Sequence, residues 1–131
     1  MIKFLSQKTI LAFHKDQIET YGGSKGVRDQ GLLESALAQP EARFGGKYLH
    51  NGLFHMAAAY GFHICKNHPF YDGNKRTALV ATYTFLYVNG YRLKADKKSL
   101  FAIIIDLANS KINKETLTRY LEKHSEERVK K

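Results

Sequence analysis

Two apolar stretches of helical length, separated by nine mostly polar residues, constrain the fold of this chain more than any other feature of its sequence. The first, Leu53 to Cys65, reads LFHMAAAYGFHIC, and the second, Thr77 to Val88, reads TALVATYTFLYV. Both are long and apolar enough to be buried helices. The residues between them, His68 to Arg76, read HPFYDGNKR. We expect this nonapeptide to be the core of a helix–loop–helix connection.

The local chemistry of the loop predicts how it folds. Pro69 cannot continue the preceding helix and disfavours helical backbone at the residue before it, so this helix should end at or just before His68. Gly73 is free to adopt a positive φ angle, and Asp72 or Asn74 is expected to cap the helix that follows. The loop should therefore carry His68 at the end of one helix and Gly73 at the start of the next.

The side chains of the loop are those that phosphoryl transfer needs. The first turn of the second helix offers backbone N–H groups, the positive end of the helix dipole and two cations to an anion such as phosphate. Its residues are Gly73, Asn74, Lys75 and Arg76. Asp72 is a hard oxygen ligand for Mg²⁺, and His68 can take a proton from an attacking hydroxyl near neutral pH. Each feature alone also occurs in ordinary helix caps, so the prediction of phosphoryl or nucleotidyl transfer depends on their combination.

The nonapeptide resembles the signature of the Fic/Doc family. Most members carry H-x-F-x-D/E-G-N-G-R-x-x-R, and the Doc (death-on-curing) branch carries H-x-F-x-D/N-A/G-N-K-R. Lys75 and Leu79 depart from the majority form at its second glycine and its second arginine, and both departures match the Doc form. The resemblance extends to the N-terminal half, at GVRD (residues 26–29), LLESAL (residues 32–37) and Pro40.

The resemblance implies a role for each residue of the loop. His68 would be the general base that acts on a target hydroxyl, Asp72 the Mg²⁺ ligand, and Phe70 the structural anchor of the motif. The phosphates of ATP would be bound by Gly73, Asn74, Lys75 and Arg76. The implied architecture is one Fic/Doc domain over residues 1–124, with the active-site loop between two central helices.

The resemblance also implies a reaction and a means of controlling it. Most Fic proteins transfer AMP to a protein hydroxyl, whereas Doc transfers the γ-phosphate of ATP to a threonine of elongation factor Tu and arrests translation. Leu79 replaces an arginine that serves AMP transfer, which favours the kinase reaction over adenylyl transfer, the alternative. The inhibitory pattern S/T-x-x-x-E-G/N fails at Thr118–Lys123. A separate inhibitor is therefore implied, an antitoxin similar to Phd with an acidic disordered segment.

The rest of the chain predicts further helices and a tail. The expected N-caps are Ser6, Asp29, Asp96 and Asn113. Residues 41–51 contain a Gly-Gly pair and are either a flexible loop or a small hairpin, near the position of the flap that covers the target peptide in Fic/Doc proteins. Without a convincing alternating strand, the fold is predicted to be all-α, a compact bundle of about six helices. Residues 125–131 are charged and expected to be a flexible tail.

Charge and cysteine content limit the possible partners and compartments. The chain of 131 residues carries a net charge of +9, which favours a nucleotide or an acidic partner. No motif for binding RNA or DNA accompanies this charge, so we do not expect direct nucleic-acid binding. The single Cys65, among apolar residues, suits a reducing cytoplasm, and neither a signal peptide nor a membrane span is predicted. A non-enzymatic alternative stays open, in which Lys94, Lys97 and Lys98 contact RNA or a ribosome.

Overall fold

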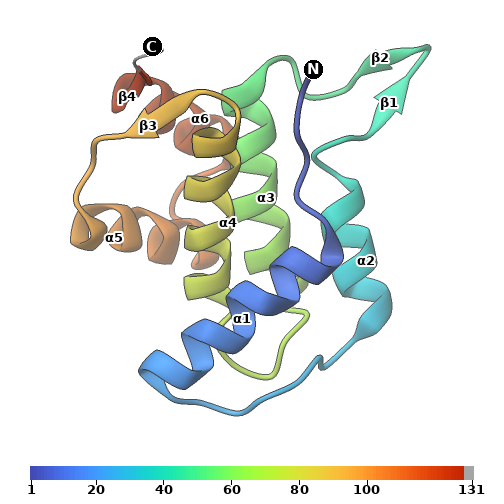
Figure 1. Ribbon diagram of the computed structural model, residues 1–131, viewed down its shortest axis with the longest axis vertical. Helices are drawn as coiled ribbons and strands as arrows, with labels where there is room; N and C mark the ends of the chain where they lie inside the picture. Colours follow the sequence, from blue (N-terminus) through green and yellow to red (C-terminus); the bar gives the residue numbers. More distant parts are fainter. Residues whose placement is uncertain (129–131) are drawn as a thin grey trace.

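The computed structural model describes residues 1–128, and its fold consists of helices with two small sheets (Figure 1). The six helices in this range are α1 (Gln7–Tyr21), α2 (Gln30–Ala38), α3 (Leu53–Asn67), α4 (Asn74–Val88), α5 (Lys97–Ala108) and α6 (Lys114–Lys123). The strands are β1 (Arg43–Phe44), β2 (Lys47–Tyr48), β3 (Tyr91–Leu93) and β4 (Ser125–Glu127). The predicted all-α bundle is confirmed. Within residues 1–128, no helix is both long enough and apolar enough to cross a bilayer.

The two apolar stretches form the central pair of helices, α3 and α4, which run side by side through the molecule (Figure 1). Small residues allow their close approach: Ala57 and Ala58 on α3 and Ala78 on α4 are fully buried. At Gly61 of α3, an added Cβ atom would lie only 2.8 Å from the hydroxyl oxygen of Thr82. Around this pair, α2 and α6 pack on α3, α1 packs on α4, and α5 contacts both.

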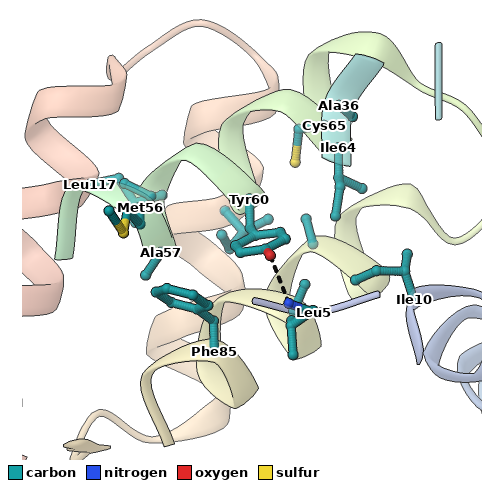
Figure 2. Packing of buried hydrophobic residues seen from close by; sticks show 14 of the residues in the cluster. Leu5, Ile10, Ala36, Met56, Ala57, Tyr60, Ile64, Cys65, Phe85 and Leu117 are labelled. Carbon is teal, nitrogen blue, oxygen red and sulfur yellow. Dashed lines mark hydrogen bonds between the residues drawn. The ribbon is translucent and has the colours of Figure 1, made fainter. Parts of the chain in front are cut away.

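A buried tyrosine fixes the segment that leads into α1. Tyr60 is fully buried on α3, and its hydroxyl oxygen accepts a hydrogen bond of 2.8 Å from the backbone N–H of Leu5 (Figure 2). The rings of Tyr60 and Phe85 pack with their centroids 5.1 Å apart. Burial raises the pKa of Tyr60 to about 12, so the phenol stays neutral. The start of α1 is thereby attached to the core.

Most of the predicted helix caps are present, and one is wrong. The side chains of Ser6, Asp29, Asp96 and Asn113 each accept a backbone N–H from the first turn of α1, α2, α5 and α6 respectively. Neither Asp72 nor Asn74 caps α4, because the N-cap position is taken by Gly73, whose φ angle is 79°. No side chain in the described part of the chain caps this helix. Its first N–H groups are therefore left for another acceptor.

The strands are the main difference between prediction and structure. Residues 41–51 contain the hairpin of β1 and β2, in which Arg43 pairs with Tyr48, so the hairpin alternative is confirmed. Of the segment predicted as a flexible tail, residues 125–131, the first three residues instead form β4 and pair antiparallel with β3. Glu126 is held there by Arg92 at 3.1 Å and Lys94 at 3.5 Å. Residues 129–131 of that tail lie outside the described residues.

Candidate active site

The loop between α3 and α4 lies at one end of the bundle, beside the end of α1 and the connection from α1 to α2 (Figure 1). Phe70 is its buried centre, since its side chain is fully excluded from solvent. The Phe70 ring stacks on the imidazole of His14 from α1, with centroids 3.8 Å apart and planes at 8°. An isolated β-bridge also joins Phe70 to Val27. Phe70 thus has the contacts that an anchor of the loop requires.

Asn74 closes the loop from within. Its side chain is buried; the Oδ1 atom accepts a hydrogen bond of 3.0 Å from the Phe70 N–H, and the Nδ2 atom donates one of 2.9 Å to the Phe70 carbonyl. Because both ends of the amide are used inside the loop, the backbone N–H of Asn74 is the group that is left for an outside acceptor. The side chain positions the loop.

Asp72 lies at the surface with its carboxylate fixed by a neighbouring segment. The carboxylate accepts a hydrogen bond of 2.6 Å from the backbone N–H of Ser24, and the Asp72 carbonyl accepts one of 2.8 Å from Nε2 of His14. The hydrogen bonds from Ser24 hold the pKa of Asp72 below its usual value. The approach is close, since a Cβ atom added at Gly23 would be 3.0 Å from that of Asp72. The exposed, ionised carboxylate suits Mg²⁺, which commonly binds through one or two carboxylates and retains several waters.

His68 ends α3 in an unusual backbone conformation. It is the C-cap residue and adopts left-handed φ and ψ angles of 50° and 54°, rather than the extended angles that a following proline favours. Arg28 holds this turn: its Nε donates to the His68 carbonyl at 2.8 Å, and its guanidinium also donates to the Asn67 carbonyl at 3.2 Å. Left-handed backbone is strained for residues other than glycine, and such residues cluster at functional sites. The imidazole of His68 is presented at the surface.

Two adjoining hollows lie beside the N-terminus of α4. The first, of about 320 Å³, is lined by five of the predicted site residues: Asp72, Gly73, Asn74, Lys75 and Arg76. The second, of about 250 Å³, shares Gln17, Tyr21, Arg76 and Phe101 with the first. Its other lining residues include Leu79 of α4 and Lys97 and Lys98 of α5. His68 borders neither hollow. The structure therefore gathers the predicted phosphate and metal residues on one side of the loop and leaves His68 at its other end.

Sequence reasoning missed two residues that shape this site, His14 and Ser24, and it included Arg28 in the GVRD segment without giving it a contact with the loop. The signal for His14 was present, because it occupies the middle of the buried stripe of α1 with Ile10 and Ile18 four residues to either side. A buried imidazole in such a stripe needs a hydrogen-bond partner. Ser24 acts through its backbone N–H, which no side-chain pattern could reveal.

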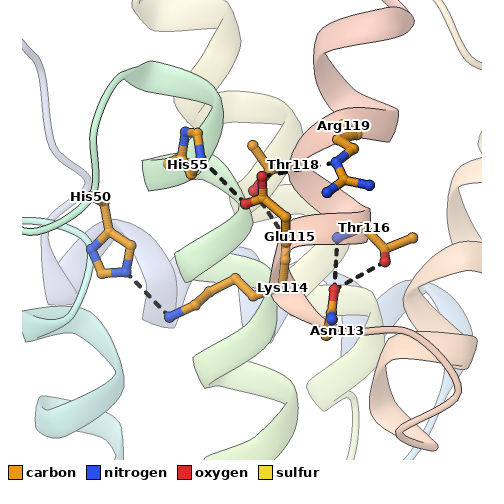
Figure 3. Close-up of polar contacts among 8 residues, drawn as sticks. All are labelled: His50, His55, Asn113, Lys114, Glu115, Thr116, Thr118 and Arg119. Carbon is orange, nitrogen blue, oxygen red and sulfur yellow. Dashed lines mark hydrogen bonds and ion pairs between the residues drawn. The ribbon is translucent and has the colours of Figure 1, made fainter.

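A second group of titratable side chains lies away from the loop. The Nζ atom of Lys114 on α6 is 3.2 Å from Nε2 of His50 and 3.3 Å from Nε2 of His63, and the contact with His50 is drawn in Figure 3. His55 pairs with Glu115 beside them at 3.3 Å (Figure 3). Burial and the charge of Lys114 lower the pKa of His50 and lower that of His63 to about 4. These contacts tie α6 to α3 and to the segment that follows β2.

Comparison with known proteins gave one family and two curated relatives. Residues 4–86 match the model of the Fic/DOC family. The protein named Toxin Doc from Mycolicibacterium smegmatis is 46% identical over 76 residues, which cover 58% of this chain and 58% of that toxin. Protein kinase doc from Escherichia phage P1 is 30% identical over 112 residues, which cover 86% of this chain and 87% of that kinase. The match thus spans little more than half of the mycobacterial protein and most of the phage protein.

Proposed function

The chain belongs to the Fic/DOC family, and we propose that it is a Doc-like toxin of a bacterial toxin–antitoxin pair that transfers the γ-phosphate of ATP to a Ser or Thr hydroxyl of another protein. One observation carries the proposal. A fixed, ionised carboxylate, Asp72, borders the same hollow as the first turn of α4 with its cations Lys75 and Arg76. This is the donor set that a metal-bound polyphosphate requires.

The start of α4 would hold the phosphates. No side chain among residues 1–128 caps this helix of 15 residues, so the N–H groups of its first turn can donate to phosphate oxygens at the positive end of the helix dipole. Lys75 is exposed beside them, and Arg76 adds a planar fork of donors. Gly73 lets the chain turn sharply into the helix, since its φ angle is positive.

Asp72 is the residue of the loop that would hold Mg²⁺ on the phosphates. A bound Mg²⁺ neutralises negative charge on the phosphate oxygens during transfer. The hydrogen bond from Ser24 keeps the carboxylate ionised and oriented before any ligand arrives. His14 supports the same residue from behind through the Asp72 carbonyl.

His68 would act on the second substrate, the protein hydroxyl. Its imidazole would accept the hydroxyl proton while the hydroxyl oxygen forms a bond to the γ-phosphorus and the bond from that phosphorus to the β–γ bridging oxygen breaks, which releases ADP. Its place at the far end of the loop supports this division of labour, because base and phosphate site must approach the transferred group from different sides.

The choice of kinase over adenylyl transfer rests on Leu79. Its side chain is half-buried, borders the second hollow and packs against the core. An apolar side chain at this point cannot bind phosphate, so it offers no replacement for the second arginine of the adenylylating members. We extend the proposal to elongation factor Tu as the target and to action in the cytoplasm, from the Doc form of the motif.

A separate antitoxin is part of the same proposal. The net charge of +9 favours association with an acidic segment, and a Phd-like disordered tail would supply one. The relatives named as a Doc toxin and a Doc kinase support a partner of this kind.

The test is to follow label from ATP into protein. The purified chain is incubated with Mg²⁺ and either elongation factor Tu or a bacterial lysate, using ATP labelled at the γ- or the α-phosphate. We expect label from the γ position only. His68→Asn, which tolerates the left-handed backbone, should abolish transfer, whereas His55→Asn, which removes a half-exposed histidine near the start of α3, should leave it unchanged.

Two results would contradict the proposal. Label from the α position would establish adenylyl transfer instead. Growth arrest that survives His68→Asn but is lost when Lys94, Lys97 and Lys98 are reversed in charge would support the non-enzymatic alternative.

A further inference from the structure

Two aromatic rings from other helices hold the guanidinium of Arg76. Its Cζ atom lies 3.8 Å from the centroid of the Tyr21 ring, at the last residue of α1, and 4.5 Å from the centroid of the Phe101 ring on α5. Tyr21 keeps 48% of its surface exposed, so the guanidinium that it covers lies at the edge of solvent. Three helices therefore meet at one cation.

This arrangement fixes an arginine while leaving its hydrogen-bonding capacity free. Aromatic rings stack on the flat faces of a guanidinium, whereas its N–H donors point outward in the plane. None of the ion pairs found within residues 1–128 involves Arg76. A carboxylate partner would have used these donors and neutralised the charge, but the two rings do neither. The side chain is thus held for a ligand that the protein itself does not supply.

The position of the held guanidinium identifies the chemistry of that ligand. Arg76, Tyr21 and Phe101 border both hollows. Lys75 borders the first hollow and Lys97 and Lys98 border the second, while Asp72 is the acidic residue on this lining. An extended, multiply charged anion that crosses from one hollow to the other would meet cations along its whole length.

We propose that Tyr21 and Phe101 are positioning residues, which hold the Arg76 guanidinium in the orientation that binds the polyphosphate chain of the nucleotide. The inference rests on the proposed function and adds residues outside the loop to it. Phe101 lies beyond the matched region of residues 4–86, so this part of the site is not contained in the family match. An arginine that is ordered before binding loses less rotamer freedom when the anion arrives.

The expected effect follows from the strength of such contacts. A cation–π contact at an exposed site contributes a factor of about 2 to 5 in affinity, so Tyr21→Leu and Phe101→Leu should each weaken polyphosphate binding by about that factor. Tyr21→Phe keeps the ring and should bind as the unmodified chain does. Tyr87→Leu is the matched control, because Tyr87 lies 4.0 Å under a different arginine, Arg128, elsewhere on the molecule.

The decisive experiment is a double-mutant cycle read by calorimetry. Tripolyphosphate with Mg²⁺ is titrated into the full chain carrying Tyr21→Leu, Arg76→Ala or both, and thermal melts confirm that each variant is folded. We expect the loss caused by Tyr21→Leu to vanish in the Arg76→Ala background, because the ring acts through the arginine. The KM for ATP should rise in Tyr21→Leu while kcat changes less.

The outcomes separate this inference from the proposed function. If Tyr21→Leu weakens tripolyphosphate binding equally with and without Arg76, or not at all, the positioning role is wrong and the kinase proposal stands. If the unmodified chain neither binds tripolyphosphate nor transfers γ-label, both are overturned.

Discussion

At the scale of single residues, the side chain of Asn74 makes its hydrogen bonds within its own loop. The motif suggested a phosphate ligand, and the structure turns the amide inward onto the backbone of Phe70. These two hydrogen bonds satisfy a buried N–H and a buried carbonyl. Removing them is strongly destabilising, because no water reaches the two groups to replace the bonds. The sequence marked Asn74 as a candidate for the site, whereas the direction of its side chain depends on the buried backbone of Phe70.

Replacing Asn74 should therefore affect stability as well as ligand binding. Asn74→Ala leaves the Phe70 N–H and carbonyl without these partners, and we expect the free energy of unfolding to fall by about 1–3 kcal/mol. Urea unfolding followed by circular dichroism measures this loss. Asn51→Ala, at an exposed asparagine, is the control and should change stability little. Equal stability of Asn74→Ala and the unmodified chain would mean that these bonds do not support the loop.

At the scale of the elements, the packing of α3 against α4 requires a close approach of the two helices. Gly61 lies inside α3, where glycine normally weakens a helix, but here its missing side chain makes room for Thr82 and Leu117 of two neighbouring helices. Gly31 lies in α2 at the surface, and an added Cβ there meets Asp29 Oδ1 at an ordinary contact distance of 3.4 Å. The same substitution should have opposite effects at these two positions.

We predict that Gly61→Ala destabilises the fold by about 1–3 kcal/mol, because overpacking between helices exceeds the gain in helix propensity. Gly31→Ala should be neutral or stabilising by up to about 1 kcal/mol. Thermal unfolding of the two variants under one buffer condition compares them directly. A rise in Tm for Gly61→Ala would show that α3 and α4 can separate at no cost.

How far an element could be predicted depended on whether its causes are local. The caps of α1, α2, α5 and α6 follow from one side chain and a backbone N–H three residues later, so the sequence was enough. The start of α4 could not be predicted in this way. The side chains of Asp72 and Asn74 accept hydrogen bonds from the backbone of Ser24 and Phe70 and not from the first turn of the helix. β4 gave no local signal either, since its Glu126 pairs with Arg92 on β3 and with Lys94 just after it.

For the whole molecule, lowering the pH below neutrality should reduce stability. His63 has a folded-state pKa of about 4, below the ordinary value of 6.5. Between these values the unfolded chain binds a proton at this position and the folded chain does not, so stability falls as the pH is lowered from about 6.5 to 4. Lys114 contributes to the shift, and it comes from a helix more than fifty positions away in the sequence. Sequence reasoning had no means of finding that pair.

The corresponding measurement is the free energy of unfolding in urea at several pH values between 7.5 and 4.5. His63→Gln should flatten the dependence, and Lys114→Met should do so in part by removing a charge that disfavours the imidazolium. Lys111→Met, at an exposed lysine, serves as the control. If His63→Gln keeps the full slope of the unmodified chain, other groups are responsible for it.

The left-handed backbone at His68 has a practical consequence for anyone who needs an inactive form of this protein. Alanine at such a position adds conformational strain to the chemical change, so loss of activity and loss of folding become confounded. Asparagine tolerates left-handed angles better than other side chains except glycine, and it lacks an imidazole. His68→Asn is therefore the substitution to choose when the proposed transfer activity is to be removed without adding strain to the loop.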